Sequence, residues 1–241
     1  LESFVSQLDE SCDMLIGVEV QDHAIWKPIF DEWRKKYPSA RFQVFSQPRP
    51  SHTPNPKISW QMELASHATG KLWLWSDADI VAPPDFLRAI RVELEASGLK
   101  ALTSPYVSRA VVQAEGMVDA LFVNIEFYPG VLLLKKRGPA AFAFGAATLF
   151  HADEFRQKTD WQKLGSALAD DFELGKSLAR VAVGQATVET LPGQGSWEKS
   201  ISHYLRWHKT IRWCQPLGYA GQIAILPVLG WLIFLLVQPL N

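Results

Sequence analysis

Two aspartates, Asp77 and Asp79, are the residues of this sequence best placed to do chemistry. They follow the apolar run KLWLW and stand two positions apart, so in an extended chain their side chains point to one side. Carboxylates that close repel each other, which raises a pKa or calls for a cation. We expect both to bind a divalent ion, Mg²⁺ or Mn²⁺, since such ions use one or two carboxylates plus substrate phosphates. The simpler alternative is a turn in which one acid caps the helix near PPDFL.

Two chemistries use such an acid pair after an apolar strand. In nucleotide-sugar transfer, a metal neutralises the departing diphosphate. Haloacid-dehalogenase-like phosphohydrolases instead carry DxDx[TV], which Asp77-Ala-Asp79-Ile-Val81 matches. Their nucleophile follows the first strand, whereas this pair follows the third expected one, and the pair alone leaves both chemistries open.

The elements that must position the acids alternate along the chain. Strands are expected at 14–20, 41–47, 71–75, 100–108 and 186–192, and helices at 1–13, 25–40, 58–69, 83–97, 168–181 and 196–213. The prolines of PPDFL suit a first helical turn, and the region 110–150 is mixed and aromatic. Alternation of this kind predicts an α/β fold with a mostly parallel sheet flanked by helices, whose ligands bind beyond the carboxyl ends of the strands.

Composition narrows the class of protein. The 241 residues allow one large domain. A formal net charge of −1 argues against nucleic acid as a partner. Two cysteines, Cys12 and Cys214, form no disulfide or metal pattern, and we interpret them as buried thiols in a reducing compartment.

The end of the chain predicts a membrane segment. After Arg212 there is no Asp, Glu, Lys, Arg or His, and Ile223–Leu240 is about long enough to cross a bilayer. The basic residues before it suit the cytoplasmic side. A buried core helix or a re-entrant helix is the alternative. We therefore expect a catalytic domain at 1–213 and a hydrophobic membrane segment at 214–241.

Three further motifs follow in order. NPKI, with Lys57, opens the helix before the DxD strand; Asp170 and Asp171 begin a later helix; HYLRW carries Arg206 and Trp207. Each has an ordinary alternative: a surface lysine, a helix cap, a solvated basic face, and a core or interfacial aromatic residue.

Together these motifs resemble the ceramide glucosyltransferases and the bacterial hopanoid-associated glycosyltransferases, membrane-bound enzymes of GT-A fold (family 21-like). The resemblance runs from about residue 1 to 212. The matching landmarks, in order, are VQDH (20–23), NPKI (55–58), SDADI (76–80), SPYVSR (104–109), DDF (170–172) and LRWHK (205–209).

The resemblance implies roles on the donor side. Asp22, or alternatively Glu19, contacts the nucleoside. Lys57 lies near the diphosphate. Asp77 and Asp79 hold the nucleotide and the metal.

It also implies the reacting groups. Asp171, with Asp170 as its neighbour, is the general base that takes the proton of the acceptor hydroxyl. Arg206 and Trp207 close over the donor diphosphate and sugar. His203 fills the first position of the family's (Q/R)xxRW motif, where it still donates a hydrogen bond but without an amide's geometry.

The function implied is a membrane-associated inverting hexosyltransferase. It would move glucose or N-acetylglucosamine from a UDP-sugar to a lipid hydroxyl, on ceramide or a hopanoid-like lipid, at the cytoplasmic face of a bacterial inner membrane. A polysaccharide synthase, the phosphohydrolase and a catalytically inactive remnant are alternatives. The last arises because the chain begins at the helix after the family's first strand, which normally helps to hold the nucleoside base.

Overall fold

The computed structural model describes residues 1–109, 116–191 and 196–222. Its strands are β1 (Met14–Glu19), β2 (Phe42–Gln47), β3 (Leu72–Ser76), β4 (Ile80–Val81), β5 (Ala101–Thr103), β6 (Tyr106–Ser108), β7 (Ala147–His151), β8 (Ala182–Val183) and β9 (Val188–Thr190). Its helices are α1 (Glu2–Val5), α2 (His23–Lys36), α3 (Pro56–Ala65), α4 (Phe86–Ser97), α5 (Met117–Leu121), the π-helix η2 (Phe122–Phe127), α6 (Tyr128–Lys136), α7 (Ala152–Lys158), α8 (Trp161–Ser166), α9 (Asp170–Leu178), α10 (Trp197–Cys214) and α11 (Pro216–Gln222).

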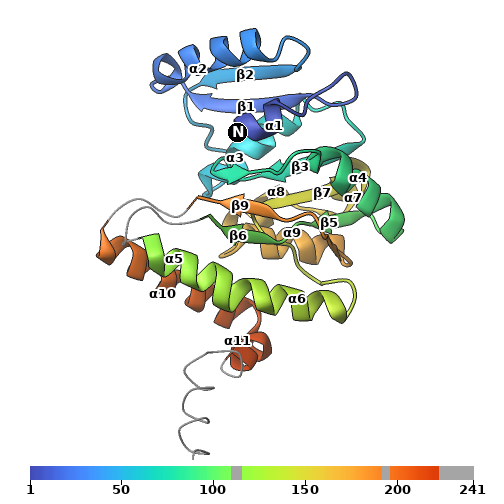
Figure 1. Cartoon of the computed structure of the whole chain (residues 1–241), viewed down its shortest axis with the longest axis vertical. Helices are drawn as coiled ribbons and strands as arrows, with labels where there is room; N and C mark the ends of the chain where they lie inside the picture. The colour runs from blue at the N-terminus through green and yellow to red at the C-terminus, as the bar shows by residue number, and fades with distance from the viewer. Residues whose placement is uncertain (110–115, 192–195, 223–241) are drawn as a thin grey trace, which may run out of the picture.

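The strands form three sheets between helices. β1 and β2 are parallel; β3-β7-β5-β8 form the central sheet; β4-β9-β6 form the third. In Figure 1 the β1–β2 pair lies at one end with α2, the two larger sheets lie in the middle, and α5, α6 and α10 run along the opposite side. The expected α/β class with helices around sheets is confirmed. The strand directions are evenly mixed, because β7 enters antiparallel between β3 and β5.

The KLWLW run is apolar because β3 is covered on both faces. Trp73 and Trp75 pack against the aromatic residues of β7 and α7, with Trp75 also stacked on Trp161. Leu72 and Leu74 pack against a second hydrophobic cluster, to which α4 contributes its buried side chains. β3 is therefore held on both faces up to Ser76. Ala78 and Asp79 then form a turn and not the extended chain that we expected, so strand alternation does not set the directions of the two aspartate side chains.

Most expected elements are found, with local corrections. The expected strand 100–108 is two strands, β5 and β6, in different sheets. The prolines of PPDFL precede α4 and do not form its first turn; Asp85 follows them with φ 61°. The expected helix 1–13 is only the single turn α1. These short-range differences leave the order of elements unchanged.

The predicted membrane segment at 223–240 lies outside the described residues. Within those residues, a different stretch, Met117–Lys136, is long and apolar enough to cross a membrane, with a mean hydropathy of 1.5. It comprises α5, η2 and α6, and part of its surface is buried in the protein.

Candidate active site

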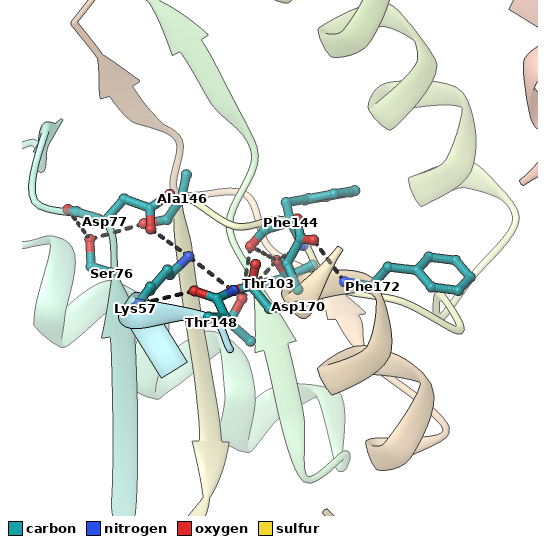
Figure 2. A network of polar contacts seen from close by, with 11 residues as sticks. Lys57, Ser76, Asp77, Thr103, Phe144, Ala146, Thr148, Asp170 and Phe172 are labelled. Atoms are coloured by element: carbon teal, nitrogen blue, oxygen red, sulfur yellow. Dashed lines mark hydrogen bonds and ion pairs between the residues drawn. The ribbon is translucent and has the colours of Figure 1, made fainter. Parts of the chain in front are cut away.

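Lys57 joins two of the predicted acids. Asn55 caps α3 by accepting the backbone N–H of Lys57 at 2.9 Å, with Pro56 in the first turn. This cap fixes where the lysine leaves the helix. Its Nζ lies 2.7 Å from Asp77 Oδ1 and 3.1 Å from Asp170 Oδ2 (Figure 2). A residue from α3 thus connects the end of β3 with the start of α9.

A tight loop between η2–α6 and β7 forms the floor of this site. Asp77 N–H and the Ser76 hydroxyl both donate to Ala146 O, at 3.2 and 2.9 Å. Phe144 is held from below by the buried hydroxyls of Thr103 and Thr148 (Figure 2). These hydrogen bonds tie the loop to the central sheet.

Gly145, between those anchors, places two carboxylates near one point. A Cβ added there would lie 3.3 Å from Asp171 Oδ2 and 3.5 Å from Asp77 Oδ2. The glycine hence keeps open a small gap into which the predicted base and a predicted metal ligand both face.

Asp171 lies in the first turn of α9, where its Oδ1 accepts the Phe172 N–H at 2.8 Å. Burial, followed by the charge of Asp170, raises its pKa to about 6, although Lys57 and the Phe172 hydrogen bond oppose the shift. A carboxylate with such a pKa is ionised at neutral pH yet holds a proton more tightly than an ordinary aspartate, which suits a general base.

Burial and neighbouring charges also shift the pKa of Asp77 and Lys57. Burial raises the pKa of Asp77 as well, against the attraction of Lys57. For Lys57 itself, burial disfavours the ammonium, but Asp77 and Asp170 outweigh it and raise the lysine pKa. The cluster thus carries more negative charge than Lys57 neutralises.

A cleft of about 240 Å³ adjoins the acids. Its lining includes Ala78, which stands between Asp77 and Asp79, and Asp22 at the start of α2. Trp60 forms one wall: its ring lies directly on Gly17 of β1, where a Cβ would come within 2.3 Å of it. The cleft has an aromatic wall and an acid, next to the DxD turn.

Glu19, the alternative to Asp22, lines the same cleft but is already engaged. One of its carboxylate oxygens pairs with Arg49, and the other accepts from Gln21. Asp22 is exposed, and its side chain makes no capping hydrogen bond. The geometry therefore favours Asp22 as the acid available to a ligand.

The residues predicted on α10 lie elsewhere. His203 Nδ1 is 3.2 Å from Asp119 Oδ1, and the Trp207 ring stacks on Phe122 at 4.6 Å between centroids. Arg206 is exposed and, with His203, lines a separate shallow hollow at the start of α10. In the described part of the chain, no hydrogen bond or ion pair joins these side chains to the acidic cluster. The structure thus assembles the acids and Lys57 but not the RW motif with them.

Sequence reasoning missed two residues: Asp119, which pairs with His203 of α10, and Gly145 of the acid cluster. Asp119 is 5 % exposed and is a carboxylate inside the apolar stretch MVDALFV. An acid in such a stretch needs a partner, and that was the available signal. Gly145 offered no signal, because its importance depends on acids distant in sequence.

The sequence model of glycosyl transferase family 21 matches residues 1–241. The chain belongs to this family. It is accordingly a glycosyltransferase, as the resemblance implied, and the phosphohydrolase interpretation of the DxD motif is set aside. No curated protein sequence matches the chain. Among solved structures, this family 21 protein is similar to mannosyl-3-phosphoglycerate synthase from Rubrobacter xylanophilus, with 12% identity, a TM-score of 0.39, and coverage of 88% of this chain and 77% of that one.

Proposed function

We propose that this family 21 protein is an inverting transferase that moves a hexose from a UDP-sugar to the hydroxyl of a membrane lipid. The observation that carries the proposal is the half-buried acid cluster, with Asp171 beside Gly145 and Asp77, at the edge of an aromatic cleft. The uridine would occupy the cleft beside Asp22 and Trp60, with the diphosphate over the DxD turn. The sugar would then face the gap at Gly145.

Asp171 would take the proton of the acceptor hydroxyl as that oxygen attacks the anomeric carbon. The attack comes from the side opposite the leaving diphosphate, so an α-linked donor gives a β-glycoside. Lys57 lies close enough to the DxD turn to meet the developing charge on the leaving group. Glucose and N-acetylglucosamine are the proposed sugars, with ceramide or a hopanoid-like lipid as acceptor.

A divalent ion fits the residues present. Among the described residues, no three His, Cys, Asp or Glu side chains are grouped as a closed metal site. Asp77 and Asp79 alone give the donor set of an ion that takes its other ligands from a diphosphate and water. When bound, Mg²⁺ or Mn²⁺ would neutralise charge on the departing UDP. We expect Asp79→Ala to abolish the metal-dependent part of UDP binding, measured by calorimetry with Mn²⁺ and with EDTA; unchanged binding would refute the assignment.

Arg206 and Trp207 would reach the donor only by a movement of α10, which donor binding would favour. His203 is proposed to hold α10 through Asp119 and not to contact the nucleotide. We place the protein at a membrane, with the segment at 214–241 as an anchor.

A UDP-release assay on the full chain tests the proposal. UDP-glucose and UDP-N-acetylglucosamine are each supplied with and without ceramide or a hopanoid-like lipid, and lipids are analysed by mass spectrometry. Release that requires lipid and yields a glycolipid is expected. Release without lipid indicates a hydrolase, and no release under either condition indicates an inactive remnant.

A further inference from the structure

We propose that Met117–Lys136 and α10 together form a docking surface that lies flat on an anionic lipid bilayer. The inference deepens the proposed function, because it names the face by which a lipid-modifying enzyme would meet its membrane. In Figure 1 these helices run side by side along the side of the molecule opposite β1 and β2. We call their outward surface the two-helix face.

The Met117–Lys136 segment, called the first helix of this face, presents a regular apolar row. Met117, Leu121 and Ile125 recur every four residues and are 49 %, 48 % and 39 % exposed. Phe122 and Val123, between them in the sequence, are buried. Residues four apart share one side of a helix, so this row faces away from the protein. Such large apolar side chains at regular spacing mark an interaction surface and not scattered exposure.

The second helix continues this face. Ile201 and Leu205 of α10 are about half exposed and also stand four residues apart. Other residues of α10 contact the Met117–Lys136 helix. Tyr204 OH donates a hydrogen bond to Glu126 Oε1 at 3.2 Å, and Trp207 stacks on Phe122. The exposed row of each helix therefore lies outside the contacts that join the two helices.

Positive charge borders the face. Lys136 and Arg137 end the first helix, and Lys209 and Arg212 lie on α10; all four side chains are exposed. In the described ranges none of the four forms an ion pair. Apolar rows beside unpaired cations complement an anionic lipid surface, where each Lys or Arg contributes about 1 kcal/mol. A protein partner would need an acidic rim around an apolar patch, and the chain's own 223–241 segment offers no acid.

The contacts of the first helix favour an in-plane position over a crossing one. Its inner side carries Asp119 and Glu126, both engaged by α10, and Phe127, which stacks on Tyr106 at 4.3 Å. A spanning orientation would break these contacts and expose two acids to hydrocarbon. Lying flat keeps them and buries only the outer row.

The docked Met117–Lys136 helix would also set the distance between the acid cluster and the bilayer surface. Phe127 packs against Phe144, next to Gly145 in the floor of the acid cluster. A bilayer against the outer row therefore lies at a set distance from the acids, as a lipid hydroxyl acceptor requires.

The test measures the surroundings of single side chains and not vesicle binding by the whole chain, because the predicted membrane segment at 223–240 would by itself hold the chain on vesicles. Leu121→Cys, Leu205→Cys and, as control, Val92→Cys are made in the full chain with Cys12→Ser and Cys214→Ser, and each is labelled with an environment-sensitive fluorophore. Val92 is 59 % exposed on α4, away from the face. Vesicles are made of phosphatidylcholine with phosphatidylglycerol, and contain lipids brominated at defined acyl depths.

Labels at 121 and 205 should brighten severalfold on vesicles and be quenched most by bromines near the headgroups, while the label at 92 stays unchanged. Quenching of label 121 chiefly by bromines near the bilayer centre would show a crossing helix and overturn the proposal. Equal response at all three positions, or none, would also overturn it. Strong emission at 121 without vesicles would show that the 223–241 segment or a second copy covers the face, and would overturn it too.

A charge variant tests the choice of lipid. Lys209→Gln with Arg212→Gln should lower the ratio of docked to free label at 121 about fivefold for each charge removed, and phosphatidylcholine alone should have a similar effect. No change in either would exclude an anionic surface. If Leu121→Cys does not fold, Ile125→Cys replaces it. No sugar nucleotide is used, so failure of docking and failure of transferase activity are observed independently.

Discussion

Replacing Asp171 with asparagine tests two properties of this half-buried carboxylate: the free energy by which its charge destabilises the fold, and its proposed role as general base. Asn preserves the size of the side chain and an oxygen for the Phe172 N–H, which donates to Oδ1 at 2.8 Å. It removes only the charge that burial and Asp170 disfavour. We therefore expect the variant to be more stable than the native protein and catalytically inactive.

The magnitude follows from the shift. The pKa rises from 3.8 to about 6, and each unit corresponds to about 1.4 kcal/mol, so ionised Asp171 destabilises the fold by at most about 3 kcal/mol. Because the folded pKa lies above the unfolded one, this destabilisation is complete above about pH 6. It declines as pH falls and is absent below about 3.8. The gain of the Asn variant should follow the same window.

Thermal unfolding of the full chain at about pH 8 and about pH 4, with EDTA to keep cations from the cluster, measures this gain. For a chain of this size, 1 kcal/mol shifts Tm by about 2–4 °C, so a rise of several degrees is expected at the higher pH and little at the lower. Asp153→Asn, an exposed acid on α7, is the control and should change Tm little at either pH.

The catalytic arm of this experiment uses the same variant. UDP affinity should stay near the native value while transfer falls by roughly 10²–10⁴-fold. In the native enzyme, kcat/KM should fall as pH drops below about 6, because the base becomes protonated. A Tm gain that is equal at both pH values would show that the charge of Asp171 does not destabilise the fold, and native transfer rates would show that Asp171 is not the general base.

Three other changes probe the framework of the site. Lys57→Met leaves its two aspartate partners uncompensated and should weaken UDP-sugar binding by about 2–3 kcal/mol, as for a lost charge-assisted contact; calorimetry with Lys57→Arg as a partial rescue checks it. Gly145→Ala should displace the predicted base by tenths of an ångström and lower kcat about tenfold, whereas Gly130→Ala, whose added Cβ meets nothing within 4 Å, should leave kcat unchanged. Asp119→Asn should raise KM for the donor more than it lowers kcat if its contact with His203 positions α10; a fall in kcat alone would contradict this.

Local signals in the sequence were sufficient for the elements that begin with clear caps or breaks. NPKI was predicted to open the helix before the DxD strand, and in the structure α3 begins within it, with Asn55 as the cap and Pro56 in the first turn. The order of strands and helices up to α4 follows from such signals together with apolar spacing. For the same reason, the neighbourhood of Lys57 and the DxD turn was predictable as the end of a strand beside the start of a helix.

Elements defined by distant partners were not predictable in this way. Met117–Lys136 is apolar almost throughout, so its spacing alone does not identify an inner side. The run ATLFH of β7 is also apolar but only five residues long, and a run of this kind fits a strand or a buried helix segment. Its pairing with β3 and β5 makes it a strand. The sequence indicated Arg206 and Trp207 by motif, but the side of α10 that meets Phe122 and Asp119 depends on the helix opposite.

The charge of the cluster is the physical argument for the proposed cation. Among the described residues, Lys57 is the cation paired with Asp77 and Asp170, and Asp171 lies beside Asp77 at Gly145. The pKa of both Asp77 and Asp171 is raised. Such a site repels a diphosphate, which is itself an anion. A divalent ion held by Asp79 and Asp77, as proposed, would reverse that repulsion and add attraction to the phosphates. Under this proposal, the acids that raise the pKa of Asp171 would also make donor binding depend on the metal.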